Sequence, residues 1–298
     1  MKILITGASG LIGQALTNSL KAAGHTTVAA VRREPRRNDE VQWNPKTGVM
    51  AASAFDGVDA VVHLAGAGIG DKRWTKAYKM EILESRTLGT ALLAKTMASL
   101  EKKPQVFLSG SAIGIYGVRD DTELSESAEI GHGFLADVCR DWETAAAPAQ
   151  AAGIRTVLLR TGIVLSPKGG ALAKQLPLFK LGLGGRFGNG KQWQSWISIT
   201  DEVNAIIHLL TSQLSGAVNL TAPTPVTNAD FTRTLASVVS RPAIIPIPSF
   251  GPKLLLGGEL AEALLFTGQR VTPNALLADG FTFEHPTLEV ALRALLNK

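Results

Sequence analysis

The chain opens on a short apolar run that leads directly into a glycine-rich turn: Lys2-Ile3-Leu4-Ile5-Thr6-Gly7-Ala8-Ser9-Gly10-Leu11-Ile12-Gly13. Residues 2–6 are typical of a buried strand, and residues 12–23 repeat apolar side chains at helical spacing before Gly24. A GxxGxxG turn between a strand and a helix predicts a dinucleotide site, because glycines permit the turn and a close approach of pyrophosphate. The helix N-terminus offers free N–H groups to the phosphates. A plain glycine turn is the alternative interpretation.

The next predicted strand, residues 26–31, decides between NAD and NADP. An NAD site usually has an acidic residue about 20 residues beyond the glycines, where it binds the ribose 2′-hydroxyl. Residues 25–33 contain no acidic side chain and end on Arg32-Arg33. A guanidinium at this point favours the 2′-phosphate of NADP. We therefore predict NADP as the cofactor, with a pair of solvated arginines as the alternative.

The rest of the first half alternates strand-like and helix-like segments. Predicted strands at 60–65, 106–109 and 156–160 alternate with helices at 74–100 and 134–147. Such alternation is typical of a parallel α/β sheet with right-handed crossovers. After residue 165 the pattern loosens, with a helix capped by Thr200, a strand at 218–220 and a strand near 244–247.

The fold class expected from this order is α/β, a Rossmann-type doubly wound parallel sheet with a smaller C-terminal substrate-side region. Residues 1–165, rejoined by 196–222, form the expected NADP-binding core. Residues 166–195 and 223–298 form the expected substrate side, which includes a small C-terminal domain at about 245–298.

Composition excludes several classes of protein. The 298 residues are 45% hydrophobic and 18% charged, which is typical of a globular protein and not of a disordered one. The net charge of +5 comes without a basic stripe, so we expect no nucleic-acid partner. The single cysteine, Cys139, excludes an intrachain disulfide, and no metal-ligand spacing occurs. No apolar stretch reaches the roughly 20 residues of a membrane span. We expect a cytoplasmic protein with neither metal nor membrane partner.

The combined motifs resemble the short-chain dehydrogenase/reductase superfamily, in particular its extended branch of nucleotide-sugar epimerases and dehydratases. More closely, the chain resembles an atypical, epimerase-like subfamily of about this length that has a small C-terminal domain. The resemblance covers nearly the whole chain and rests on Thr6–Gly13, Asp59–Gly66, Asp71–Trp74, Gly89-Thr90, Ser109–Gly117, Trp142-Glu143, Leu181–Gly185, Trp196–Asp201 and Gly268–Val271.

The resemblance implies cofactor contacts along the chain. Arg32 would bind the 2′-phosphate, and Val164 would lie at the nicotinamide end. Glu81 and Arg86, on the predicted long helix, would face the cofactor, although an ordinary surface pair is the alternative. Extended members usually have Asn at the position of Arg86. The pyrophosphate turn and the loop under the adenosine ribose would consist of Gly7, Ser9, Gly10, Leu11, Ile12, Leu64, Ala65 and Gly66.

The catalytic Tyr-x-x-x-Lys of the superfamily is absent. Alignment on Trp142-Glu143 places Leu135 at the tyrosine position and Cys139 at the lysine position, and these side chains cannot reproduce the acid–base pair. The remaining catalytic candidates are Ser111, at a strand end, and Tyr116, in the loop that follows. A packing role for Tyr116, a proton-donating His132 and either a reactive or an inert Cys139 are the alternatives.

We expect an NADP(H)-dependent oxidoreductase or epimerase-like enzyme acting on a small, anionic or nucleotide-linked substrate. Lys72 and Arg73 would hold the anionic group beside Trp74. A non-catalytic NADP(H)-binding sensor or scaffold is the alternative, because the catalytic pair is missing. The helices predicted at 74–100 and 134–147 would pair in a possible homodimer.

Overall fold

The computed structural model describes all 298 residues and is built around one eight-stranded sheet. The strands lie in the order β12-β8-β6-β5-β1-β2-β3-β4, and every neighbouring pair is parallel except β3 with β4. Their bounds are β1 (Lys2–Thr6), β2 (Thr26–Val31), β3 (Glu40–Asn44), β4 (Val49–Met50), β5 (Ala60–His63), β6 (Val106–Ala112), β8 (Arg155–Thr161) and β12 (Gly216–Leu220).

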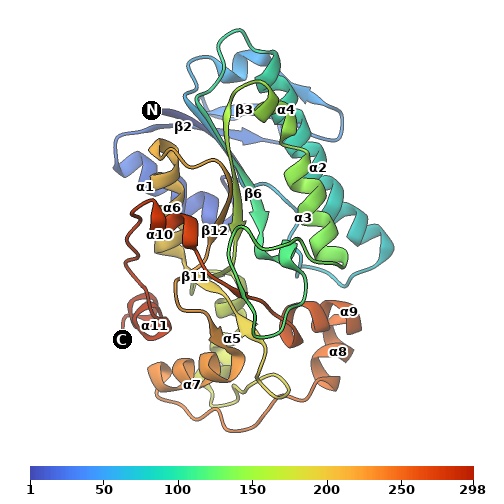
Figure 1. Ribbon diagram of the computed structural model, residues 1–298, viewed down its shortest axis with the longest axis vertical. Helices are drawn as coiled ribbons and strands as arrows, with labels where there is room; N and C mark the ends of the chain where they lie inside the picture. The colour runs from blue at the N-terminus through green and yellow to red at the C-terminus, as the bar shows by residue number, and fades with distance from the viewer.

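Helices cover both faces of this sheet (Figure 1). On one face lie α1 (Leu11–Ala22), α6 (Ile199–Thr211) and α10 (Asn274–Ala278), and on the other α2 (Lys76–Ser99), α3 (Phe134–Thr144) and α4 (Ala147–Ala151). The Rossmann-type, doubly wound parallel sheet predicted from the sequence is therefore confirmed. None of the helices combines the length and the apolar character needed to cross a bilayer.

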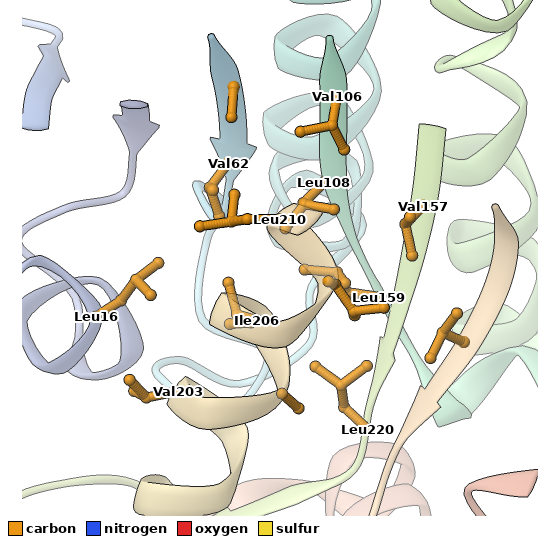
Figure 2. Close-up of a cluster of buried hydrophobic side chains, with 14 of the residues drawn as sticks. Leu16, Val62, Val106, Leu108, Val157, Leu159, Val203, Ile206, Leu210 and Leu220 are labelled. Atoms are coloured by element: carbon orange, nitrogen blue, oxygen red, sulfur yellow. The ribbon is translucent and has the colours of Figure 1, made fainter. Parts of the chain in front are cut away.

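The main core lies between the sheet and the pair α1 and α6. Figure 2 shows Leu16 of α1 and Ile206 of α6 facing Val62, Leu108 and Leu159 of the strands. Fully burying each such side chain contributes roughly 1.5–3 kcal/mol. The same cluster includes three residues from the far end of the chain, Leu276, Phe281 and Phe283.

A second group of elements lies beyond the carboxyl ends of the strands, at the bottom of Figure 1. Part of this group packs around a separate hydrophobic cluster that includes Trp196 and Phe231. The helical elements are α5 (Gly170–Lys180), α7 (Asn228–Val239), α8 (Phe250–Leu256), α9 (Gly258–Ala261), a π-helical turn (Glu262–Phe266) and α11 (Leu288–Leu296). The short strands are β7 (Glu123–Leu124), β9 (Ile163–Leu165), β10 (Trp193–Gln194), β11 (Trp196–Ser198), β13 (Val226–Thr227) and β14 (Arg270–Val271). Elsewhere in the chain, two 3-10 turns lie at Ala52–Phe55 and Ile113–Tyr116.

Several predicted elements are wrong in detail. The helix capped by Thr200 begins at Ile199, and Ser198 caps it by accepting a hydrogen bond from the Asp201 N–H. The strand near 244–247 reduces to a single bridge between Phe187 and Ile247. The predicted helix 134–147 is two helices, and α5 and β3 were missed. Pro177 inside α5 explains that omission, because proline normally argues against a helix interior.

The start of α6 also holds the C-terminal part of the chain. The Asp201 carboxylate is fully buried and accepts hydrogen bonds from the backbone N–H groups of Glu284 (2.7 Å) and His285 (3.0 Å). The Ser198 hydroxyl donates to the same carboxylate at 2.9 Å. This clasp fixes residues 284–285 against the sheet, since each lost bond to a buried charge costs about 1.5–3 kcal/mol.

Candidate functional site

A cavity of about 340 Å³ lies at the carboxyl ends of β1, β5, β6 and β8, where ligands bind in open α/β sheets. Its lining brings together the expected residues Gly7, Gly10, Leu11, Ile12, Leu64, Ser111 and Val164. It also includes residues that were not predicted as cofactor or catalytic residues, namely Gly13, Gly110, Trp142, Thr161, Ile163, Gly170 and Ala171. Ser9, Arg32, Ala65, Gly66, Glu81, Arg86 and Tyr116 are not part of this lining.

The glycine turn fits a dinucleotide pyrophosphate. Gly7 has φ +70°, and a Cβ on Gly13 would lie 2.2 Å from the Gly7 carbonyl oxygen, so neither position accepts a side chain. Gly10 forms the N-cap of α1 without a side-chain hydrogen bond, which leaves the first helical N–H groups to a ligand. Ser9 is exposed, and its carbonyl accepts a bond from Gln14. The backbone of the turn is therefore arranged to bind an anion.

The carboxyl end of β2 offers positive charge, and the buried carboxylate beside it is paired. Glu40, on the neighbouring strand β3, accepts both Arg33 guanidinium nitrogens at 2.7 Å and the Arg36 N–H at 2.8 Å. The Arg33 hydrogen bonds lower the pKa of Glu40 to about 2. Arg32 is exposed and forms no ion pair. Glu40 is therefore already occupied by Arg33, and Arg32 directly after β2 is an exposed guanidinium without an ion pair.

A buried histidine and a buried threonine fix the loop after β5. His63 Nδ1 and Thr6 Oγ1 lie 2.6 Å apart, and the Ala65 N–H donates to the same threonine oxygen at 3.3 Å. Burial lowers the pKa of His63 to about 3, so the ring stays neutral. His63 is therefore a core histidine and not a base. This arrangement fixes the start of the Leu64–Gly66 segment beside the glycine turn.

Ser111 is the hydroxyl group at the end of β6 that lines the cavity. It donates to Glu143 Oε1 on α3 at 2.7 Å, and Arg160 of β8 donates to both oxygens of that carboxylate at 2.8 and 3.0 Å. Glu143 was not predicted as a site residue, although it belongs to the Trp142-Glu143 motif of the sequence. The three side chains form a charge-assisted network behind the cavity wall.

Tyr116 does not reach the cavity. Its ring is fully buried, and its hydroxyl donates to Asn219 Oδ1 at 2.7 Å and accepts from Arg160 Nη1 at 3.0 Å. Burial raises the pKa of Tyr116 above its ordinary value. The catalytic role expected for Tyr116 is therefore not supported, and its alternative role in packing is.

Neither the thiol of Cys139 nor the imidazole of His132 is placed to act as a reacting group. Burial raises the pKa of Cys139 to about 12, so the thiol is protonated and unreactive at neutral pH. The inert interpretation of Cys139 is therefore supported. His132 is exposed and is not among the residues that line the cavity.

The basic loop 71–74 is occupied by contacts within the protein. Lys72 Nζ lies 3.7 Å from the Glu81 carboxylate, and both side chains are largely exposed, so Glu81 pairs with Lys72 and not with Arg86. Arg73 donates to the Leu255 carbonyl at 3.0 Å and so caps α8. The expectation that these two cations wait for an anionic substrate is therefore not supported.

A second buried carboxyl lies behind Thr161, at the carboxyl end of β8. Thr161 Oγ1 donates to Glu202 Oε1 at 3.0 Å, and Glu202 Oε2 has no hydrogen-bond partner. Burial raises the pKa of Glu202 to about 8, so the group is largely protonated near neutrality. The site thus places the Glu143–Arg160 pair and the largely protonated Glu202 behind its hydroxyl groups.

Comparison with known proteins places this geometry in a family. An epimerase family protein of Mycobacterium bovis is 45% identical over 291 residues, which is 97% of this chain and 96% of that protein. A crystal structure of human epimerase family protein SDR39U1 with NADPH has a TM-score of 0.91 at 32% identity and covers 100% of both chains. The structure of a nucleoside-diphosphate sugar epimerase from Corynebacterium glutamicum has a TM-score of 0.80 at 38% identity, over 99% of this chain and 58% of that one.

Two family models match the chain. Residues 247–295 match a domain of unknown function, a range close to the small C-terminal domain expected from the sequence. Residues 3–220, which contain the glycine turn, the cavity and the Ser111 network, match the model of the NAD-dependent epimerase/dehydratase family. The chain therefore belongs to the NAD-dependent epimerase/dehydratase family.

Proposed function

We propose that this protein binds NADP(H) in the cavity and acts as an oxidoreductase or epimerase-like enzyme on a small substrate. The observation that carries the proposal is the turn at Gly7 and Gly13, which has no room for a side chain and leads into the uncapped start of α1. The unpaired Arg32 at the end of β2 supports NADP over NAD. The human relative crystallised with NADPH supports the same choice.

Each part of the cavity has a task in this proposal. The backbone N–H groups at the start of α1 hold the pyrophosphate, and Arg32 binds the 2′-phosphate. Leu11, Ile163 and Val164 form the apolar wall that excludes water at the nicotinamide end. When bound, the dinucleotide supplies hydride transfer to or from a substrate carbon.

Ser111 is the proposed proton-handling group. Its proton points to Glu143, so its oxygen is free to accept a hydrogen bond from a substrate hydroxyl. As a substrate alcohol is oxidised, its O–H proton passes to Ser111 Oγ while the Ser111 proton passes to Glu143 Oε1. The reverse transfers protonate a carbonyl oxygen during reduction. Ser111 and Glu143 thus take over the task of the absent Tyr-x-x-x-Lys pair.

The substrate is proposed only by class, as a small molecule that is anionic or linked to a nucleotide. The cytoplasmic location and the possible homodimer through α2 and α3 stay predictions. A native mass measurement at micromolar concentration would decide between monomer and dimer.

Calorimetric titration with NADPH, NADP⁺ and NADH tests the cofactor proposal. Arg32→Ala should weaken NADPH binding by about 10- to 100-fold and leave NADH binding unchanged, because only NADPH has the 2′-phosphate. Arg293→Ala, on exposed α11 and paired with Glu289, is the matched control. Failure of the wild-type protein to bind any of the three dinucleotides would overturn the proposal.

A non-catalytic NADP(H)-binding sensor or scaffold is the second candidate. The observation that favours it is the protonated, buried Cys139 at the position where the superfamily has lysine. Turnover of NADPH with a panel of nucleotide sugars and small carbonyl compounds separates the two functions. Turnover that falls at least about 100-fold in Ser111→Ala supports the enzyme. Tight NADPH binding without turnover on the panel supports the sensor.

A further inference from the structure

The group of elements beyond the carboxyl ends of the strands carries a concentrated set of exposed apolar side chains. The seven most exposed large hydrophobic residues of the whole chain, with 66–86% of their surface exposed, all belong to it. Two follow α5 (Leu181 and Leu183), two follow α7 (Ile244 and Ile245), and three belong to α8. Single exposed apolar residues are ordinary, but a set of this size in one part of the molecule indicates a binding surface.

The segment after α5 and the segment after α7 lie side by side. Arg241 Nε donates to the Lys180 carbonyl at 3.2 Å, and the Ile247 N–H donates to the Arg186 carbonyl at 2.8 Å. In Figure 1 the connection from α7 to α8 runs along the lower end of the molecule. The exposed residues therefore share one surface, which we call the basic apolar face and define as residues 180–186 and 241–255.

The sequence around this face is basic and has no acidic residue. Residues 166–200 contain five Lys or Arg and no Asp or Glu, and residues 231–258 contain three and none. The net charge of the whole chain is only +5, so the remainder of the chain is net negative. Of these eight cations only Arg233 and Lys253 pair with a carboxylate. Positive charge is thus collected at the same end as the exposed apolar side chains, and most of it is unpaired.

These features decide between the possible occupants of the face. A second copy of this chain is disfavoured, because like charges would then meet across the interface. Protein interfaces are enriched in Tyr, Trp and Arg and depleted of Lys, whereas the exposed apolar residues here are Leu, Ile and one Phe beside lysines. Leucine and phenylalanine next to lysine and arginine are typical of segments that lie in the interface of a membrane.

We propose that the basic apolar face attaches the protein to the surface of a membrane that contains anionic lipid. Ile244, Ile245 and the apolar residues of α8 enter the boundary between headgroups and acyl chains, and Lys180 and Arg186 bind the anionic headgroups. Attachment of this kind lies within the headgroup layer and involves no spanning helix. The sequence-based expectation of no membrane partner was drawn from the lack of a spanning stretch, and it did not consider a surface contact.

Vesicle flotation tests the proposal on the full chain. The protein is mixed with vesicles of phosphatidylcholine alone and with vesicles that also contain about 25% phosphatidylserine. Wild type should bind the mixed vesicles at least about 10-fold more tightly than the neutral ones. That preference should fall as the salt concentration rises from about 50 to 500 mM, because salt screens the headgroup charge.

Two double variants separate the apolar and the charged contributions. Ile244→Ser with Ile245→Ser should weaken binding to the mixed vesicles by at least about 10-fold, because two inserted side chains are lost. Lys180→Glu with Arg186→Glu should weaken it by a similar factor, because attraction becomes repulsion. Both pairs of residues are exposed, and the thermal midpoint of each variant shows whether its fold is kept.

Each variant has a matched control elsewhere on the surface. Lys102→Glu with Lys103→Glu makes the same change of charge at exposed residues before β6, at the opposite end of the strands. Val49→Ser with Leu277→Ser removes two apolar side chains that are also exposed, on β4 and α10. Both controls should bind the mixed vesicles as wild type does. NADPH affinity should be the same in all four variants, so this test is independent of the proposed function.

Three results would overturn the proposal. The first is a wild type that binds no mixed vesicles, as expected if the face instead accepts an acidic protein. The second is a loss of binding in the controls that equals the loss in the variants of the face. The third is a lipid-free wild type that sediments as a dimer and becomes a monomer in Ile244→Ser with Ile245→Ser, which would assign the face to a second copy.

Discussion

The two ends of the cavity are built in different ways. At the proposed phosphate end, the turn between β1 and α1 offers backbone N–H groups, and a single run of consecutive residues forms it. At the nicotinamide end, side chains from β6, α3, β8 and α6 meet, and charges such as Glu143 and Arg160 are buried there. We infer that cofactor binding depends on the room left by the glycine turn and on the direction of its backbone. The proposed chemistry depends instead on buried polar and charged side chains.

The largest effect is expected from removing the carboxylate of that network. Glu143→Leu should lower the free energy of unfolding by about 3–5 kcal/mol, because Arg160 would remain buried without its partner. Chemical denaturation measures the loss. Glu289→Leu, at the exposed pair with Arg293, is the control and should change stability by no more than about 1 kcal/mol. Equal effects of the two variants would contradict the claim that the nicotinamide end depends on buried charge.

The phosphate end should respond to volume instead of charge. Gly13→Ala should lower stability by about 1–3 kcal/mol, because its Cβ would overlap the Gly7 carbonyl oxygen. The same variant should weaken NADPH binding by about 100-fold. Gly251→Ala adds a methyl group in α8, where nothing lies within 4 Å of the new Cβ, and should be close to neutral. Unchanged NADPH affinity in Gly13→Ala would show that the turn tolerates a shift of its backbone.

The last expected effect is a pH dependence, and it again belongs to the nicotinamide end. The folded-state pKa of Glu202 is about 8, against an ordinary 4.5, so the folded protein keeps a proton that the unfolded chain releases. This carboxyl therefore favours folding fully below about pH 4.5, and that contribution is lost as pH rises through about 8.

Glu202→Gln should remove the dependence. The stability of the variant relative to wild type should be roughly 1–3 kcal/mol higher at pH 9 than at pH 5. Urea unfolding at the two pH values measures this, with Glu101→Gln at an exposed position as the control. Parallel pH profiles for wild type and Glu202→Gln would mean that the buried carboxyl is ionised throughout.

Local sequence predicted the phosphate end well. The bounds of β1 and β2 agree with the predicted 2–6 and 26–31, because a continuous apolar run next to glycine is a local signal. Arg32 follows β2 directly, so its place at the strand end could be predicted too. The neutralisation of Glu40 by Arg33 could not, since it requires β3 to lie beside β2.

The nicotinamide end was predicted only as single residues. Ser111 and Glu143 are 32 residues apart, and Arg160 lies 17 residues further on, so no spacing rule joins them. The same holds for Arg86 and Trp142, whose contact depends on the packing of α2 against α3. Tyr116 shows the opposite problem, because its loop suggested exposure while Arg160 and Asn219 hold it inside.

The clasp between Asp201 and residues 284–285 has a consequence for synthesis on the ribosome. Phe281 and Phe283 complete the core beneath β1, β5, β6 and β8, so the N-terminal sheet emerges long before its last core residues do. Until then, apolar surface on α6 and the strands stays uncovered, which favours aggregation and chaperone contact. The closing step of folding is therefore expected to be the docking of this late segment, and Asp201→Asn, which weakens the clasp, should slow that step in refolding traces.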